Sequence, residues 1–109
     1  MTVQEYGRFF DPRAGVVRAG LVNRAHEQLH IVEGSILAAA PRLSGRWCSL
    51  AGLVPLPCVE APLIVGAGLN YHDHAAESPL PPPSSPMLFA CDPAALLGDG
   101  GVLPFPTPQ

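Results

Sequence analysis

The chain has 109 residues and a mass of 11.4 kDa, enough for one domain or for one small domain and part of another. Its net charge of −3 argues against nucleic acid as the main partner, because a nucleic-acid interface needs a basic stripe. The longest apolar run, at 61–69, is far shorter than the roughly 20 residues that cross a bilayer. The three cysteines show no CxxC spacing, and the N-terminus lacks the features of a signal peptide. We therefore expect a cytoplasmic protein without a disulfide framework.

The first third of the chain predicts a β-meander. Segments 5–10, 15–22 and 28–32 are short and rich in β-branched and aromatic residues, and turn-like sequences separate them. Ser35 and Pro41 predict one or two helical turns over 35–40, because serine caps helices and proline ends them. We expect a linker at 42–47 and then an extended, proline-broken segment at 53–57.

The pattern changes after residue 60. Residues 63–65 form a wholly apolar run that leads into a Gly-Ala-Gly sequence, as a buried strand would. Asn70 is a good N-cap, and Asp73 favours a capping-box-like arrangement, which predicts a helix from Tyr71 to about Ser78. Prolines end this helix. The sequence then predicts a strand at 86–91, a turn at 99–101 and an extended piece at 102–106.

The sequence HEQLH at residues 26–30 matches the zinc motif of metalloproteases. That chemistry requires a helix, on which two histidines four residues apart reach one ion. Here the motif lies between strand-like segments, and on a strand the imidazoles of His26 and His30 would stand about 13 Å apart. We favour a turn followed by an exposed strand. A small zinc protease is kept only as a function that metal analysis can test.

Two further motifs near residue 70 have competing interpretations. The Gly-Ala-Gly sequence at 66–68 lacks the third glycine of a dinucleotide loop, since Tyr71 occupies that position. On a helix, His72 and His74 diverge by about 200°, so one metal ion cannot easily take both. His74 and Glu77 share a face, and a carboxylate beside an imidazole raises its basicity and gives a pair that activates water. A solvent-exposed surface pair is the alternative that spacing leaves open.

The sequence IVGAGLNYHDHAAE at 64–77 resembles the signature "IVCVGLNYxDHAAE" of the fumarylacetoacetate hydrolase family. The similarity extends over nearly the whole chain with hardly a gap. Residues 33–35 and 44–45 resemble the family's small N-terminal domain, and residues 53–62 resemble its linker strand. Residues 86–89 with 93–98 resemble the segment after its lid loop.

This resemblance implies an α+β, mainly β fold in two parts. Residues 1–59 correspond to the small N-terminal β-meander domain of the family. Residues 60–109 correspond to the incomplete start of its catalytic domain, a mixed β-roll with one short helix.

The resemblance also implies a chemistry. In the family, the oxo and carboxylate oxygens of an acylpyruvate-like substrate chelate a Mg²⁺ or Mn²⁺ ion. The substrate is hydrolysed at a C–C bond, isomerised or decarboxylated. By resemblance, His74 is the base that activates water and Glu77 is its orienting partner, while residues 78–86 correspond to the lid. The candidate substrate-binding or lid residues are Asn70, Tyr71, Ser78, Phe89 and Cys91.

Two departures from the family pattern bear on catalysis. The lysine that helps to hold substrate falls at Cys91, and a thiol supplies no fixed positive charge. The carboxylate metal ligands of the family lie downstream of residue 109, and no acid follows Asp99. We therefore assign no metal ligand to this chain and expect it to bind no ion alone.

Two functions remain open. The chain is either part of an enzyme for a small carboxylated substrate, as a homodimer or with a complementing chain, or a non-catalytic remnant or interaction module. In both cases the strands after residue 64 lack their family partners, so we expect the chain to dimerise, bind a partner or aggregate.

Overall fold

The structure, a computed structural model, describes residues 3–79, 81 and 83–106. Contacts divide these residues into two compact units, one formed by 3–59 together with 97–106, the other by 60–96. The described residues form seven β-strands, one α-helix and two 3₁₀ helices, and the sheets are antiparallel. The chain is therefore mainly β with one short α-helix, as the sequence predicts. None of the helices in the described ranges is long and apolar enough to span a membrane.

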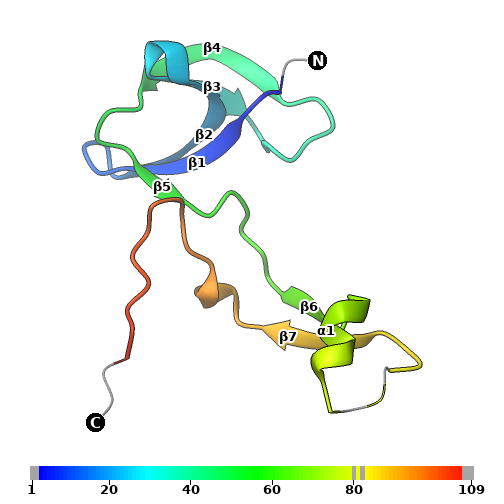
Figure 1. Cartoon of the computed structure of the whole chain (residues 1–109). Coiled ribbons are helices and arrows are strands. Elements are labelled where there is room, and N and C mark those ends of the chain that lie inside the picture. The colour runs from blue at the N-terminus through cyan, green and yellow to red at the C-terminus, as the bar shows by residue number, and fades with distance from the viewer. Residues whose placement is uncertain (1–2, 80, 82, 107–109) are drawn as a thin grey trace. The chain divides into compact units, whose positions relative to one another are not determined.

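The first unit is an antiparallel meander whose last strand returns to the first (Figure 1). The strand order is β4-β3-β2-β1-β5, so β1 pairs with both β2 and β5. The predicted strands at 5–10, 15–22 and 28–32 and the extended segment at 53–57 are confirmed, with shifts of one or two residues at their ends. The strands are β1 (Tyr6–Asp11), β2 (Val16–Asn23), β3 (Gln28–Glu33), β4 (Arg42–Ser49) and β5 (Val54–Leu56).

The turn between β1 and β2 is organised by Asp11, whose side chain is buried. One carboxylate oxygen accepts hydrogen bonds from the backbone amides of Arg13 at 3.1 Å and Ala14 at 3.4 Å. The other oxygen accepts one from Arg18 Nε at 2.8 Å. The bond from Arg18 and the two amides hold the pKa of Asp11 below its ordinary value. These contacts convert the predicted turn at Asp11–Gly15 into a fixed connection.

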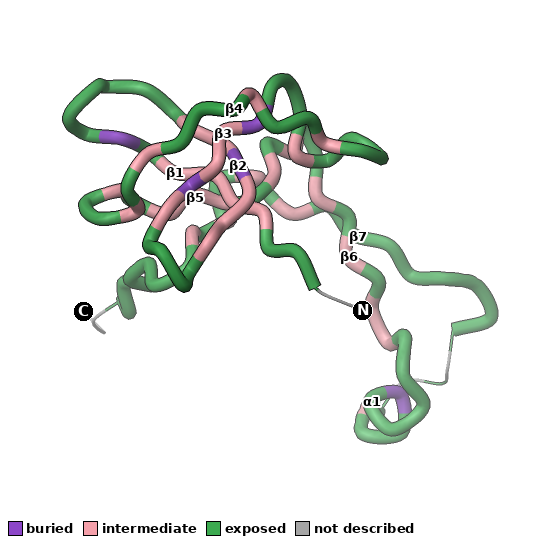
Figure 2. Tube along the Cα trace, turned by 90° about the horizontal axis from the view of Figure 1, so that it is seen from above, coloured by how far each residue is buried: buried purple, intermediate pink, exposed green. Residues whose placement is uncertain are grey.

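The buried apolar residues of the first unit are few and lie on β3. Leu29 is fully buried and Val32 nearly so. Gly20 on β2 lets the neighbouring strand approach closely, since a Cβ there would clash with the carbonyl of His30. Figure 2 shows buried positions at several points of this sheet, surrounded by half-buried ones. The sheet is thus a thin structure with a small core.

Two predictions for the β3–β4 region are wrong. Residues 35–40 do not form helical turns: Leu37 N donates to Ser35 Oγ at 3.0 Å, and the chain makes one turn only. So short a segment cannot offset the cost of helix nucleation. The predicted linker at 42–47 belongs to β4, where Arg42 Nη2 lies 2.7 Å from Glu33 Oε2 on β3. Gly45 and the exposed polar residues of an edge strand conceal its period in the sequence.

The second unit is a two-stranded sheet with a helix between the strands. It contains β6 (Ile64–Gly68), α1 (His72–Glu77), β7 (Met87–Cys91) and the 3₁₀ helix Pro93–Ala95. The strand predicted at 86–91 is confirmed.

The apolar strand after residue 60 is not buried, in contrast to the prediction. Leu63 is 58% exposed and Val65 55%, and Ala75 is the buried residue of the unit among those described (Figure 2). Two strands bury little surface, and an isolated hairpin is only marginally stable in water. Because Val65 and Leu88 lie on one face and Phe89 on the other, apolar groups are exposed on both faces.

The Asp11 network predicts an acid-sensitive stability. A carboxylate whose folded-state pKa is lowered stabilises the fold above its ordinary pKa of about 3.9, and this contribution is lost as the pH falls through the lowered value. We expect Asp11→Asn to lower the free energy of unfolding at pH 7, and the difference from the wild type to shrink as the pH falls below about 3.9. Urea titrations followed by the fluorescence of Trp47, the one tryptophan, measure this. Glu27→Gln is the control with an equal charge change; a pH-independent loss in Asp11→Asn would contradict the expectation.

The exposed hairpin predicts self-association. Val65→Asp with Leu88→Asp places two charges on one apolar face, and we expect this variant to sediment with a larger monomer fraction than the wild type. Ser84→Asp with Ser85→Asp adds the same charge to exposed positions outside the strands and serves as the matched control. Equal sedimentation of the two variants would show that this face does not drive association.

Candidate functional site

The connection between β6 and α1 contains a strained residue. β6 ends at Gly68, and Leu69 then adopts a left-handed backbone with φ of 50°. A residue other than glycine in this region costs about 1–3 kcal/mol, and such residues cluster at functional sites. Nothing in the sequence indicates this conformation directly, because an Asn rather than a Leu would be expected in it. The strain marks this turn as a candidate site.

The N-cap of helix α1 lies one residue later in the sequence than predicted. The residue at the N-cap is Tyr71, with φ of −115° and ψ of 139°, and no side chain caps the helix. The predicted capping by Asn70 with Asp73 is therefore wrong. The left-handed turn at Leu69 delays the helix, so that Asn70 lies before the cap position.

The structure places His74 and Glu77 at one pocket. They stand three residues apart on α1, and together with Leu69 and Ser78 they line an open pocket of about 340 Å³. Both side chains are exposed, and within the described residues no hydrogen bond joins them. An imidazole and a carboxylate that share one solvent-filled space can act on the same water molecule, although each is also compatible with a solvated surface helix.

Most of the other predicted site residues lie elsewhere in the second unit. Asn70 lines a separate pocket of about 240 Å³ with Ser84 and Ser85. Tyr71 is 74% exposed. The ring of Phe89 covers Gly66, whose Cβ, if present, would clash with it, and Cys91 is half-buried opposite Ile64. Of these residues only Ser78 lines the same pocket as His74 and Glu77. The predicted lid at 78–86 includes residues 80 and 82, which lie outside the described ranges.

The histidines of HEQLH are not arranged for zinc. His26 belongs to the 3₁₀ helix Arg24–His26, which Asn23 caps, and His30 belongs to β3. The helix that the protease motif requires is thus replaced by a turn and a strand, as predicted. The strand is not exposed as expected, because β3 lies between β2 and β4 and contains the buried Leu29 and Val32. Across the described ranges, no three His, Cys, Asp or Glu side chains come together as a possible metal site. The described residues therefore do not fit the Mg²⁺ or Mn²⁺ site of the resembling family by themselves, and we derive no step through an ion.

Comparison with known proteins adds no neighbour. No family model, no curated protein and no solved structure matches the chain.

The sequence did not point to a pocket in the first unit. Its volume is about 370 Å³, and residues of β1, of the β4–β5 connection and of the segment after residue 96 line it. Its apolar residues are scattered over the chain, so only the pairing of β5 with β1 brings them together. Of the exposed apolar residues near the end of the sequence, Leu97 lines this pocket.

The strain at Leu69 is testable. We expect Leu69→Gly to relieve about 1 kcal/mol and to slow hydrogen exchange at the amide of Ala75, which donates to the carbonyl of Tyr71 at 2.9 Å in α1. Leu63→Gly removes the same side chain from a position that lacks a positive φ and is the control. Faster exchange at Ala75 in the Leu69 variant would mean that the side chain, rather than the backbone conformation, governs this turn.

Proposed function

We propose that the chain is part of a metal-dependent enzyme of the fumarylacetoacetate hydrolase family, acting on acylpyruvate-like or related oxo-dicarboxylate substrates. In this proposal residues 1–59 are the family's small N-terminal domain, and residues 60–109 are the start of its β-roll. The observation that carries the proposal is the common pocket of His74 and Glu77, on a helix that follows the signature-like sequence at 64–77.

The roles of the two residues follow from their chemistry. A neutral imidazole has a ring nitrogen with a free lone pair that accepts a proton, so His74 takes a proton from the attacking water. Glu77 lies one turn along the same helix and accepts the other ring N–H, which fixes the tautomer. Such hydrogen bonds often tighten only when substrate binds, so the absence of a contact between the two residues in the described structure is compatible with this role.

The rest of the active site comes from outside this chain's described residues. The metal ligands are supplied by a complementing chain, and the exposed faces of β6 and β7 offer a surface for such an association. Cys91 stands where the family has a lysine, so another residue supplies the positive charge for the substrate carboxylate.

A non-catalytic interaction module is the second candidate. It is favoured by Cys91 and by the lack of a carboxylate cluster in the described ranges. On this alternative, His74 and Glu77 are a solvated surface pair, and the exposed hairpin binds a partner protein.

The test uses the protein as purified from its own cells, with whatever chain co-purifies. Native mass spectrometry first establishes the composition of the complex. Turnover of an acylpyruvate is then measured with added Mg²⁺ or Mn²⁺. We expect His74→Ala to lower kcat by about 100-fold or more, because general base catalysis typically contributes that much.

The control is His72→Ala on the same helix. His72 is exposed, and its position is two residues from His74, on a diverging side of α1. We expect its turnover to stay within about twofold of the wild type. Unchanged turnover in His74→Ala would remove the pair from the mechanism. A complex made only of 11.4 kDa chains without turnover would favour the interaction module.

A further inference from the structure

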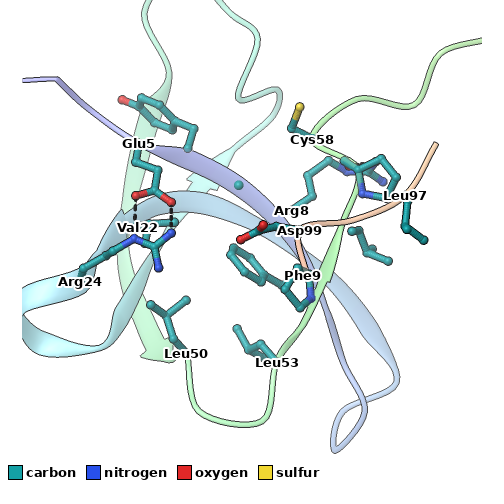
Figure 3. A pocket seen from close by; sticks show the side chains of 15 residues that line it. Glu5, Arg8, Phe9, Val22, Arg24, Leu50, Leu53, Cys58, Leu97 and Asp99 are labelled. Carbon is teal, nitrogen blue, oxygen red and sulfur yellow. Dashed lines mark hydrogen bonds and ion pairs between the residues drawn. The ribbon is translucent and has the colours of Figure 1, made fainter. Parts of the chain in front are cut away.

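Apolar side chains form part of the lining of the first-unit pocket (Figure 3). Phe9 comes from β1 and Val22 from β2, while Leu50 and Leu53 come from the β4–β5 connection. Its volume of about 370 Å³ is at the lower end of the roughly 300–1,000 Å³ of ligand clefts. A cavity of this size and lining accommodates one or two apolar side chains.

The formal charges of the residues that line this pocket cancel. Arg24 Nε donates to Glu5 Oε2 at 2.9 Å, and a second contact joins Arg24 Nη2 to Glu5 Oε1 (Figure 3). This pairing lowers the pKa of Glu5 and raises that of Arg24. Arg8 and Asp99 are the other charged lining residues, so the formal charges sum to zero. The lining favours an uncharged ligand, since a charged one would disturb this balance.

Segment 102–106, Val-Leu-Pro-Phe-Pro, has the complementary properties. Val102 is 85% exposed, Leu103 82% and Phe105 90%. No charged residue occurs from Gly100 to the end of the sequence. Three large apolar groups in five residues, all in solvent, are typical of a segment that binds a protein surface. The prolines keep it extended and so reduce the entropy lost on binding.

We propose that segment 102–106 of one copy of the chain binds in the first-unit pocket of a second copy. Proline-containing extended segments dock in grooves lined by aromatic side chains, and Tyr6 and Phe9 both line this pocket. The uncharged segment matches a lining with no net charge. Phe105 is its main apolar anchor, with Leu103 as the second.

The geometry of the chain favours a second copy over the same chain. Leu97 and Asp99 already line the pocket, and Gly98 is held against β5, where a Cβ would clash with the carbonyl oxygen of Pro55. The segment leaves through a turn in which Gly101 N donates to Gly98 O at 3.0 Å. To return to the pocket it would have to reverse within a few residues. Proline at 104 restricts itself and Leu103 to extended backbone, which opposes such a reversal.

The proposed contact is reciprocal. Each copy offers one segment and one pocket, so two copies can form a closed dimer with two identical contacts. The contact involves neither His74 nor the faces of β6 and β7, and it can therefore be tested apart from the proposed function.

A peptide titration tests the contact directly. The receptor is the full chain with Leu103→Asp and Phe105→Asp, labelled with ¹⁵N, and the ligand is a peptide of residues 100–109. We expect chemical-shift changes at the amides of Phe9, Val22 and Leu53, and none with a peptide that carries the same two substitutions. Leu50→Glu and Leu53→Glu, both outside the strands, should each weaken binding by about tenfold or more, while the spectrum reports whether each remains folded. Binding without shifts at the pocket, or no binding, would overturn the proposal.

Sedimentation equilibrium then distinguishes a second copy from the same chain. Both samples carry Val65→Asp and Leu88→Asp, so that association through the hairpin is suppressed. Adding Leu103→Asp and Phe105→Asp should raise the dimer dissociation constant by about tenfold or more. If both samples are monomers while the peptide still binds the pocket, the segment occupies its own pocket and the second copy is ruled out.

Discussion

The return of β5 to β1 is the interaction on which the first unit depends. Without it, β1 would be an open edge of the sheet. The pairing also sets Pro57 beside Arg8, whose Nη1 donates to its carbonyl at 3.1 Å. One backbone ladder therefore covers the edge of β1 and brings together walls of the first-unit pocket. The same pairing gives a thin unit with a small core a fixed shape.

The second unit, as far as the structure describes it, has no added strand of this kind. Its two strands pair with each other, and within the described residues no third strand covers either edge. Apolar side chains that a larger sheet would bury stay in solvent, and the helix between the strands presents His74 and Glu77 on an exposed surface. The proposed catalytic role and the proposed need for another chain therefore have one physical origin. A site built on this hairpin gains rigidity only when something covers the hairpin.

The sequence predicted most of the local structure and less of the long-range structure. Short segments rich in β-branched and aromatic residues, separated by turn-like sequences, located β1, β2 and β3, because these signals lie in consecutive residues. β4 was missed since it is an edge strand, where exposure removes the alternation. The prediction that 63–65 are buried is wrong for another reason. A run of apolar residues shows that burial would be favourable, but not that another element is present to cover the strand. At the site, spacing alone put His74 and Glu77 on one face, whereas the backbone of Leu69 could not be read from an apolar side chain.

The two pairings of β1 differ in the length of chain that they close. Asp11 and Arg18, which tie β1 to β2, are seven residues apart, whereas Arg8 and Pro57, beside the β1–β5 ladder, are 49 apart. Closing a longer loop costs more entropy, and contacts that are distant in sequence form more slowly. The β1–β2 hairpin can thus form early in folding, while β1 keeps its other edge open until β5 arrives. During synthesis or refolding this interval exposes the strand to pairing with another chain, so the rate at which β5 docks governs how much of the protein reaches its folded state.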